Sequence, residues 1–382
     1  MEPLNQITPR IFVAATRQDD GKTTTSLGLL GSLLRRMSRV GYIKPVGQRY
    51  VIVDGRKIDE DSVLIDKTFD IRLPLEAMSP IAVESGFTRQ YIEQGGQPDL
   101  PELVVRAFNR AAWEKDFVII EGTGHAGVGS VIDLSNARVA SLLRSKVIIV
   151  SQGGVGKPID EISLNLALFE KAGVEVIGVV LNKVLPAKIE SLWPVAEKGL
   201  ARLGLPLLGI VPLSNELRKP TLNQIARELK ATFLSGDKMK RRRVSRVVIG
   251  TASSRHAHIY IEPGSLLITA GDRDDLLRAI FEAPGGGDNP LAGVVLTDEF
   301  PPEDELVDLL KARGIPCLVA QHDCYTIASK INGMTVKTEP GDQEKIEMIR
   351  NLIGQNVDIP RIVASATPSG EDPQQMRLPA LD

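Results

Sequence analysis

The sequence predicts an α/β protein in which a mainly parallel sheet, covered by helices, is followed by a second and smaller α/β domain. Short, continuously apolar segments alternate with longer segments whose apolar residues recur at helical spacing. Strands that are apolar throughout are typical of parallel sheets with both faces buried. A polar and strongly basic stretch at 235–246 interrupts the alternation, and a length of 382 residues suits two domains.

The first domain is expected to span residues 1–234. Its first strand is the apolar run 10–16 (RIFVAAT), and its first helix is 22–37, where leucines recur at helical spacing. Further strands are expected at 40–46, 117–121, 146–151, 176–181 and 207–211, and further helices at 101–114, 135–144, 160–172, 189–203 and 216–230.

Residues 235–246 (SGDKMKRRRVSR) have no apolar face and are interpreted as a solvated linker, with a phosphate or nucleic-acid contact as the alternative. The second domain is expected at 247–360. Residues 361–382 are rich in Pro, Ser and Gln and are expected to form a disordered tail. Strands are predicted in the second domain at 247–250, 265–270, 292–297 and 315–320, and helices at 273–282, 303–313 and 323–331.

Composition limits the classes of function. Hydrophobic residues make up 43% and charged residues 25% of the chain, as in globular proteins. The formal net charge of −2 argues against a nucleic-acid-coating protein. No apolar run is long enough to span a bilayer, the first residues lack a signal-peptide layout, and the 2 cysteines do not form a disulfide framework. These features predict a cytoplasmic protein.

The stretch ATRQDDGKTTT, residues 15–25, follows the first predicted strand and opens the first predicted helix. A loop that wraps phosphates needs inward backbone N–H groups and a helix N-terminus behind them. Gly21 supplies backbone freedom, Lys22 would reach the outer phosphates, and Thr23 would bind magnesium. The sequence therefore predicts a phosphate-binding loop (P-loop) for Mg–ATP.

This loop resembles that of dethiobiotin synthetase and its relatives, which reads GxxxxxGKT. Ala15 replaces the first glycine, so the departure is one methyl group. The resemblance implies that Thr16 and Thr24 also belong to the nucleotide site. The same superfamily contains partition-type ATPases, in which a signature lysine stands at the position of Arg17. Arg17 could contact a neighbouring subunit's phosphates or be a solvated loop charge.

Three further segments occur in the order that the resemblance requires. Lys44, in GYIKPVGQ, matches a lysine near the substrate and the transferred phosphate. KIDEDSVLI contains the candidate magnesium ligand Asp61, with Asp59 as the second choice. FVIIEGTGH ends an apolar strand with Glu121, which the resemblance makes a magnesium ligand.

A final segment, VVLNKV, contains Asn182, which matches the family's base-recognition asparagine. An amide can pair with the adenine edge as both donor and acceptor. The alternative is an asparagine that caps a turn at the end of a strand. The resemblance to this family extends over about 210 residues.

The second half of the chain resembles the DRTGG domain. The motif reads Asp272-Arg273-Asp274-Asp275, so its two glycines are absent, and Asp272 could instead cap a helix. Cys317, His322 and Cys324 lack the spacing of a zinc site. The two domains together resemble the N-terminal regulatory half of long bacterial phosphotransacetylases. Because no acetyl-transferring domain follows residue 360, a stand-alone version is expected.

Three functions remain open at this point. The first is an ATP-binding regulator in which nucleotide binding, or slow hydrolysis, is coupled to the DRTGG domain. The second is an ATP-dependent ligase similar to dethiobiotin synthetase, with Lys22, Lys44 and magnesium neutralising charge in the transition state. The third is a partition-type ATPase switch. The resemblance also implies a homodimer and a protein partner in acetate or related metabolism.

Overall fold

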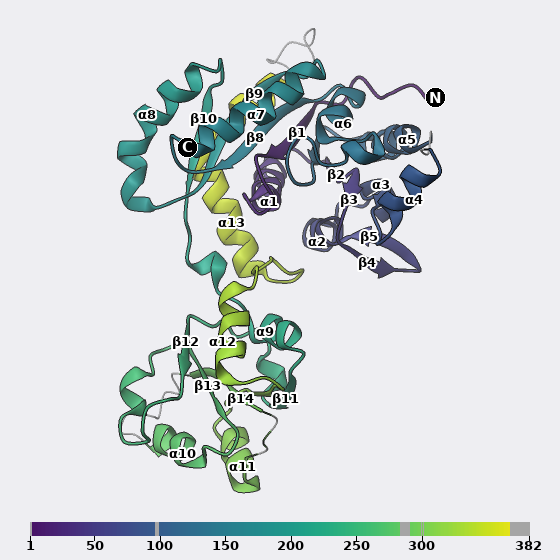
Figure 1. The fold of residues 1–382 in the computed structure, drawn as a ribbon. Helices are drawn as coiled ribbons and strands as arrows, with labels where there is room; N and C mark the ends of the chain where they lie inside the picture. Colours follow the sequence, from purple (N-terminus) through teal and green to yellow (C-terminus); the bar gives the residue numbers. More distant parts are fainter. Residues whose placement is uncertain (1, 96–98, 283–290, 299, 301, 367–382) are drawn as a thin grey trace. The chain divides into compact units, whose positions relative to one another are not determined.

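The computed structural model describes residues 2–95, 99–282, 291–298, 300 and 302–366 (Figure 1). The chain forms two compact units. Unit 1 comprises Met1–Ser214 and Thr338–Asp382, and unit 2 comprises Asn215–Lys337. The predicted fold class is confirmed, but both domain boundaries differ from those expected.

Unit 1 is built on a six-stranded, entirely parallel sheet with strand order β10-β9-β8-β1-β7-β2. All six strands predicted from apolar runs are present. Most of their residues are buried, which explains the absence of polar alternation in the sequence. Their bounds are β1 Arg10–Ala15, β2 Val40–Ile43, β7 Phe117–Glu121, β8 Lys146–Gln152, β9 Val176–Val184 and β10 Leu207–Pro212.

Helices cover both faces of this sheet (Figure 1). One hydrophobic cluster joins Phe12 and Ile120 of the sheet to Phe108 of α5 and Phe169 of α7. The buried leucines of α1 (Lys22–Leu33) do not belong to that cluster, because α1 packs on the opposite face together with α13 (Gln343–Asn356). The predicted helices are found as α1 Lys22–Leu33, α5 Leu100–Ala112, α6 Asn136–Leu142, α7 Lys157–Lys171 and α8 Ile189–Ala201.

Two helices at the end of the chain, α13 (Gln343–Asn356) and α14 (Ile359–Ala366), return to unit 1. The sequence placed these residues in the second domain and the tail, and this prediction is wrong for 338–366; the remainder of the expected tail, 367–382, lies outside the described residues. Ile346, Ile349 and Ile353 of α13 are buried, at the spacing of one helix face. A Cβ on Gly28 of α1 would lie 2.5 Å from Cβ of Ile353, so the two helices meet at a small-residue contact.

Residues 46–95 form a group of short elements that the sequence analysis did not predict. A hairpin turns at Asp54-Gly55, where both residues have positive φ. Asp-Gly between two strand segments is a strong hairpin signal, so the sequence itself carries evidence for this turn. The elements are β3 Val46–Gly47, β4 Tyr50–Val53, β5 Arg56–Asp59, α2 Glu60–Phe69, α3 Leu75–Met78, β6 Ile81–Ala82 and α4 Phe87–Glu93.

Unit 2 contains a five-stranded mixed sheet of order β11-β15-β14-β13-β12, in which β11 is antiparallel to β15 and the other pairs are parallel. Helices flank the sheet (Figure 1). The strands are β11 Thr232–Ser235, β12 Arg246–Ile249, β13 Ser265–Ala270, β14 Leu291–Thr297 and β15 Cys317–Val319. The helices are α9 Leu222–Leu229, α10 Asp274–Glu282, α11 Asp304–Ala312 and α12 Cys324–Gly333.

Residues 235–246 are not a solvated linker. Val244 is 3% exposed in a hydrophobic cluster of unit 2, and its backbone N–H donates to the carbonyl of Pro220. The predicted helix 216–230 is divided at Pro220, and α9 begins with a capping box between Thr221 and Gln224. The boundary of unit 2 therefore precedes α9. Short 3₁₀ turns occur at Ser130–Ile132, Pro186–Lys188, Glu216–Arg218, Asp237–Met239 and Ala257–Tyr260.

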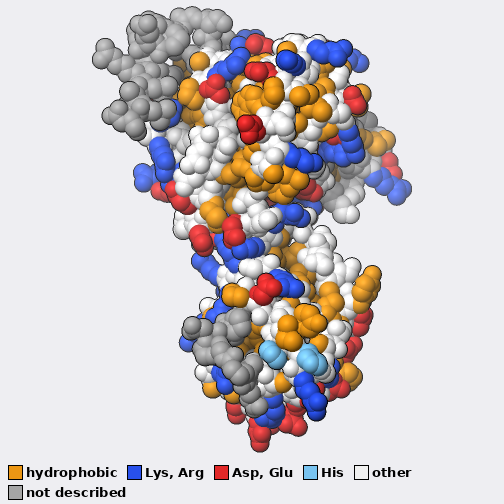
Figure 2. Space-filling view, turned by 90° about the vertical axis from the view of Figure 1, so that its left-hand side faces the viewer, with side chains coloured by type: hydrophobic (Ala, Val, Ile, Leu, Met, Phe, Trp, Pro, Cys, Tyr) orange, Lys and Arg blue, Asp and Glu red, His pale blue; other side chains and the backbone are white. Residues whose placement is uncertain are grey.

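Acidic side chains gather at the lower end of unit 2 in the space-filling view (Figure 2). The first turns of α10 and α11 carry Asp274, Asp275, Asp304 and Glu305, where carboxylates interact favourably with the positive end of a helix. Among the residues that the structure describes, no helix has the length and apolar character needed to cross a membrane.

Candidate functional site

The predicted site residues of unit 1 gather at the carboxyl edge of the parallel sheet. The loop 16–21 connects β1 to α1, and Glu121 ends the neighbouring strand β7. Gly21 has φ 103°, a left-handed conformation, and a Cβ at this position would overlap the side-chain amide of Asn182. Glycine is therefore required here both by the backbone and by the available space.

Lys22 is buried at the first position of α1. Its Nζ donates to the carbonyls of Arg17, at 3.2 Å, and Gly124, at 3.0 Å. Burial lowers the pKa of Lys22, and the Glu121 carboxylate partly offsets this effect. The ammonium is thus held inside the loop by backbone oxygens, which phosphate oxygens could replace.

The three predicted magnesium ligands meet at one point. The Thr23 hydroxyl donates to Oε1 of Glu121 at 2.7 Å and lies 3.3 Å from Oδ2 of Asp61. These oxygens come from the starts of α1 and α2 and from the end of β7. A hydroxyl and two carboxylates form the oxygen-only donor set that Mg²⁺ prefers, with waters and phosphates completing its octahedron. The side chains present therefore fit this ion.

Glu121 is 1% exposed and is held from two sides. Besides Thr23, Tyr42 donates its hydroxyl to Oε2 at 3.0 Å. Burial raises the pKa of Glu121, and repulsion from Asp61 raises it further. Sequence reasoning missed Tyr42, which lies in β2 two residues before Lys44, the residue that follows the strand.

Lys44 and the two aspartates form a buried ion cluster. Lys44 Nζ lies 3.0 Å from Oδ1 of Asp59 and also contacts Oδ2 of Asp61. Burial alone would lower the pKa of Lys44, but the carboxylates of Asp61 and Asp59 outweigh it and raise that pKa. The Lys44 ammonium therefore holds the carboxylates of Asp59 and Asp61 in position.

The structure distinguishes the two aspartates that the sequence left as alternatives. Asp59 caps α2, because its Oδ1 accepts from the Asp61 backbone N–H at 2.9 Å, while its own N–H donates to Ser79. Asp61 is the residue beside Thr23. Burial raises the pKa of Asp59, and the Lys44 ammonium opposes that rise.

Asn182 supports the loop in this structure. Its Nδ2 donates to the carbonyl of Asp20 at 2.8 Å, and its Oδ1 accepts from the backbone N–H of Lys183 at 2.8 Å. The amide is 4% exposed, so both of its polar groups are occupied by the chain. Base recognition by Asn182 is not the role this geometry favours.

The loop is also held by a side chain that sequence reasoning missed. Asp20 is buried, and its Oδ2 accepts from the Thr16 hydroxyl at 2.6 Å and from the Arg17 backbone N–H at 2.8 Å. Thr16 therefore faces Asp20, whereas Thr24 is half-buried in the first turn of α1. The Arg17 guanidinium forms an ion pair with Glu161 of the same chain.

The candidate residues of unit 2 do not form a metal site. Cys317 is fully buried in β15, and burial raises the pKa of its thiol to about 12. Within the described parts of the chain, no group of three or more His, Cys, Asp and Glu could hold a metal ion. The helix α10 begins at Asp274, with Arg273 bonded to Asp275, so Asp272 precedes the helix rather than capping it directly.

The sequence matches two family models. Residues 9–221 match the AAA domain model, and residues 224–334 match the DRTGG domain model. The chain is 28% identical over 380 residues to a phosphate acetyltransferase from Nitrosomonas europaea, covering 96% of this chain and 52% of the relative. A phosphate acetyltransferase from Pseudomonas aeruginosa is 29% identical, with 91% of this chain and 50% of the relative covered.

The chain spans about half the length of the curated relatives it matches. Among solved structures, the septum site-determining protein MinD complexed with Mg-ADP, from Pyrococcus horikoshii, is 17% identical, with a TM-score of 0.36. It covers 56% of this chain and 84% of its own chain. The chain thus belongs to the AAA domain family, with a DRTGG domain following, and this combination matches the N-terminal region of phosphate acetyltransferases.

Proposed function

We propose that unit 1 binds Mg–ATP and that the protein is a regulator, in which nucleotide binding or slow hydrolysis is coupled to the DRTGG domain. One observation carries the proposal: the Thr23 hydroxyl donates to Glu121 and lies beside Asp61. Three oxygen ligands are thus pre-organised where a phosphate loop ends. Thr23, Asp61 and Glu121 would hold the magnesium, which neutralises charge on the phosphates.

Each remaining residue has a role in this proposal. Lys22 would exchange its two carbonyl partners for phosphate oxygens, with Gly21, Thr16 and Thr24 shaping the loop around them. Asn182 and Asp20 keep the loop in place through the contacts described above.

The regulatory role is favoured over the alternatives by two contacts. In a ligase similar to dethiobiotin synthetase, Lys44 would act on the transferred phosphate, but here it is paired with two carboxylates. In a partition-type switch, Arg17 would reach a neighbouring subunit, but here it pairs with Glu161.

Direct binding tests the site. Titration calorimetry of Mg–ATP with the full chain should give a dissociation constant that Lys22→Ala weakens by at least about tenfold, because a charge-assisted contact to phosphate is removed. Lys171→Ala, an exposed lysine at the end of α7, is the matched control and should bind as the wild type does. Equal affinity of wild type and Lys22→Ala would refute the site.

Phosphate release separates the functions. A slow, Lys22-dependent release of phosphate from Mg–ATP that does not respond to diaminopelargonate plus bicarbonate supports the regulator. A large, Lys22-dependent stimulation by that diamine would instead make the protein a ligase.

The partners proposed are nucleotide, a second copy of the chain and a protein of acetate or related metabolism, in the cytoplasm. The relatives named phosphate acetyltransferase support the metabolic assignment. Hydrophobic side chains lie among charged ones on the face shown in Figure 2, and α8 exposes 40% of Trp193 and 52% of Val195. Light scattering with and without Mg–ATP would test whether the chain is a dimer.

A further inference from the structure

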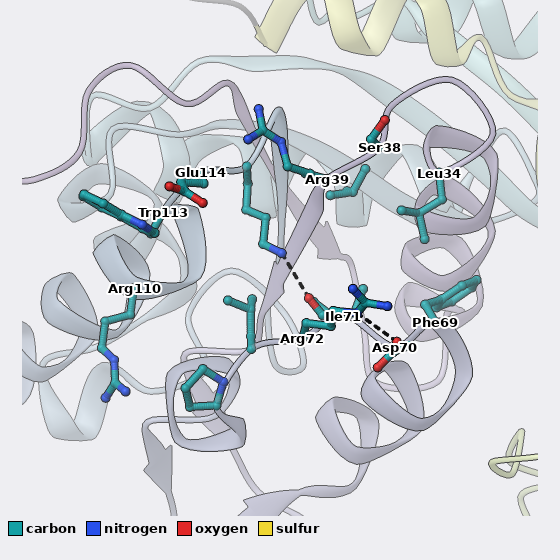
Figure 3. A pocket seen from close by; sticks show the side chains of 14 residues that line it. Leu34, Ser38, Arg39, Phe69, Asp70, Ile71, Arg72, Arg110, Trp113 and Glu114 are labelled. Carbon is teal, nitrogen blue, oxygen red and sulfur yellow. Dashed lines mark hydrogen bonds and ion pairs between the residues drawn. The ribbon is translucent and has the colours of Figure 1, made fainter.

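A groove of about 820 Å³ lies in unit 1 at the opposite edge of the sheet from the loop 16–21 (Figure 3). Three connections form its walls: the segment from α1 to β2, the end of α2 with the turn to α3, and the end of α5 with the turn to β7. The volume is that of a small-molecule site.

The groove is rich in cationic groups. Its lining includes Arg39, Arg72, Arg110 and Lys115, against the two carboxylates of Asp70 and Glu114. Within the described chain, neither Arg110 nor Lys115 forms an ion pair. Lys115 instead donates to the carbonyl of Ile71 at 3.0 Å. The lining therefore carries four cationic side chains against two carboxylates, and two of the four have no ion-pair partner among the described residues.

The other two cations of the groove, Arg72 and Arg39, form ion pairs that are exposed to solvent. Arg72 lies 3.0 Å from Asp70, and both side chains are about four-fifths exposed, at 82% and 78%. Arg39 pairs with Asp116 outside the lining at 2.8 Å. Exposed ion pairs of this kind contribute little, so an incoming anion could take over either guanidinium.

The groove also has an apolar component. Trp113 is 71% exposed, an unusual situation for an indole, and it lies beside Arg110 and Glu114 at one end of the groove (Figure 3). Phe69 and Leu34 line the other end. An aromatic face next to guanidinium groups suits a ligand in which an anionic group adjoins a ring.

Several helices and strands have one end at the groove and the other end at the candidate nucleotide site. The helix α1 begins with Lys22 and Thr23 and is followed by Leu34 in the groove; its 12 residues separate the two sites by about 18 Å. Similarly, α2 starts with Glu60 and Asp61 and ends at Phe69. The strand β7 follows Lys115 and ends at Glu121, and β2 starts at Val40 and leads to Lys44.

We propose that this groove binds a small anionic metabolite carrying a phosphate or carboxylate beside a ring, and that its occupancy changes the affinity for Mg–nucleotide at the loop. The second half rests on the proposed function, whereas the first does not. Any coupling must be reciprocal, so nucleotide would change the affinity of the groove by the same factor.

Pyridoxal 5′-phosphate is a suitable probe because it combines a ring, a phosphate and an aldehyde. The aldehyde carbon forms an imine with a neutral lysine amine and releases its oxygen as water; borohydride then delivers hydride and leaves a stable secondary amine. Burial, together with Arg39 and Arg72, lowers the pKa of Lys115, which raises the neutral fraction of that amine.

The test uses the full chain with Trp193→Phe, which leaves Trp113 as the remaining tryptophan, and with Lys22→Ala to disable the loop. We expect saturable quenching of Trp113 and, after reduction, modification of Lys115 by mass spectrometry. Replacing Arg72 and Arg110 together by alanine should raise the dissociation constant of the probe, measured by the quenching of Trp113, at least about tenfold. Lys115→Arg should keep the quenching and lose the covalent label.

Two results would overturn the site: no saturable quenching of Trp113, or labelling spread equally over exposed lysines such as Lys67 and Lys171.

Coupling between the groove and the nucleotide site is measured in a chain with an intact Lys22. Probe fixed at Lys115 should change the dissociation constant of Mg–ADP at least about threefold, with Lys115→Arg as the unmodified control. An unchanged constant removes the coupling. Failure of the intact chain to bind nucleotide refutes the proposed function and the coupling, while the groove is judged by the quenching of Trp113 and the labelling of Lys115.

Discussion

At the scale of single residues, the candidate site is organised by buried charge. Glu121, Asp61 and Asp59 lie close together, and the Lys44 ammonium pairs with both aspartates. Carboxylates held together without a cation repel one another, and burial adds to the cost. The unliganded site is therefore expected to reduce stability, and a bound divalent ion should reverse this effect.

Glu121→Gln removes one of these charges at nearly constant shape. The Tyr42 and Thr23 hydroxyls that donate to Glu121 can rotate to meet an amide. Without ligand, we expect the free energy of unfolding of this variant to exceed that of the wild type by on the order of 1 kcal/mol. Stabilisation by Mg–ATP should be lost. Urea unfolding with and without Mg–ATP measures both effects, and a variant less stable than wild type without ligand would contradict the account.

The raised pKa of Glu121 also predicts opposite pH dependences for folding and for metal binding. A carboxyl whose pKa is higher in the folded protein favours folding when protonated, so its contribution becomes less favourable as pH rises from its ordinary pKa through the raised one. Magnesium needs the carboxylate, so Mg–ATP affinity should fall as pH decreases through that same window. Unfolding and calorimetry at a series of pH values, starting at the ordinary pKa of glutamate and rising above it, test both directions. In Glu121→Gln, the part of the pH dependence of the free energy of unfolding that comes from Glu121 should be absent.

At the scale of elements, the packing of α1 against α13 depends on small residues. Gly28 and Gly31 of α1 leave space that Ile353 and Arg350 of α13 occupy. This contact holds the helix that starts with Lys22 and Thr23. The position of the phosphate loop thus depends on a segment more than 300 residues away, which no local pattern in the sequence indicates.

Gly28→Ala tests this contact. Alanine is the better helix former by about 1 kcal/mol, so helix propensity alone predicts stabilisation. Because the added methyl would lie 2.5 Å from Cβ of Ile353, we expect destabilisation of about 1–3 kcal/mol instead. Gly333→Ala in α12, where an added methyl meets nothing within 4 Å, is the control. Stabilisation by Gly28→Ala in urea unfolding would show that the helices are not in close contact.

At the scale of the whole molecule, the chain leaves unit 1 after Ser214, forms unit 2 and returns at Thr338. The strand β10 is contacted by α13, and Val357 forms a β-bridge to Gly209. Unit 1 is thus completed by residues from both ends of the chain.

This arrangement predicts the behaviour of fragments. Residues 215–337 should fold alone, because their sheet and flanking helices form a complete core. Residues 1–214 should melt at a lower temperature than a fusion of 1–214 to 338–366 through a short Gly/Ser linker, because the fragment exposes the α1 surface that α13 covers. Circular dichroism melting measures the difference. Equal melting temperatures would mean that α13 and α14 do not complete unit 1.

The sequence by itself determined the fold class, the six parallel strands and the phosphate loop with Lys22 and Thr23. These features are local: a buried strand must be apolar throughout, and the turn at Gly21 requires a left-handed backbone. The hairpin at Asp54-Gly55 was equally local, and its signal could have been recognised.

Only the tertiary structure decided the rest, because the deciding contacts join residues far apart in the chain. It placed Asp61 rather than Asp59 beside Thr23, set Asn182 against the loop and returned α13 to unit 1. The composition of the basic stretch 235–246 predicts a solvated linker. In the structure, the buried Val244 and backbone hydrogen bonds pack this stretch onto unit 2. Local propensity is a weak guide wherever non-local burial supplies most of the stabilising free energy.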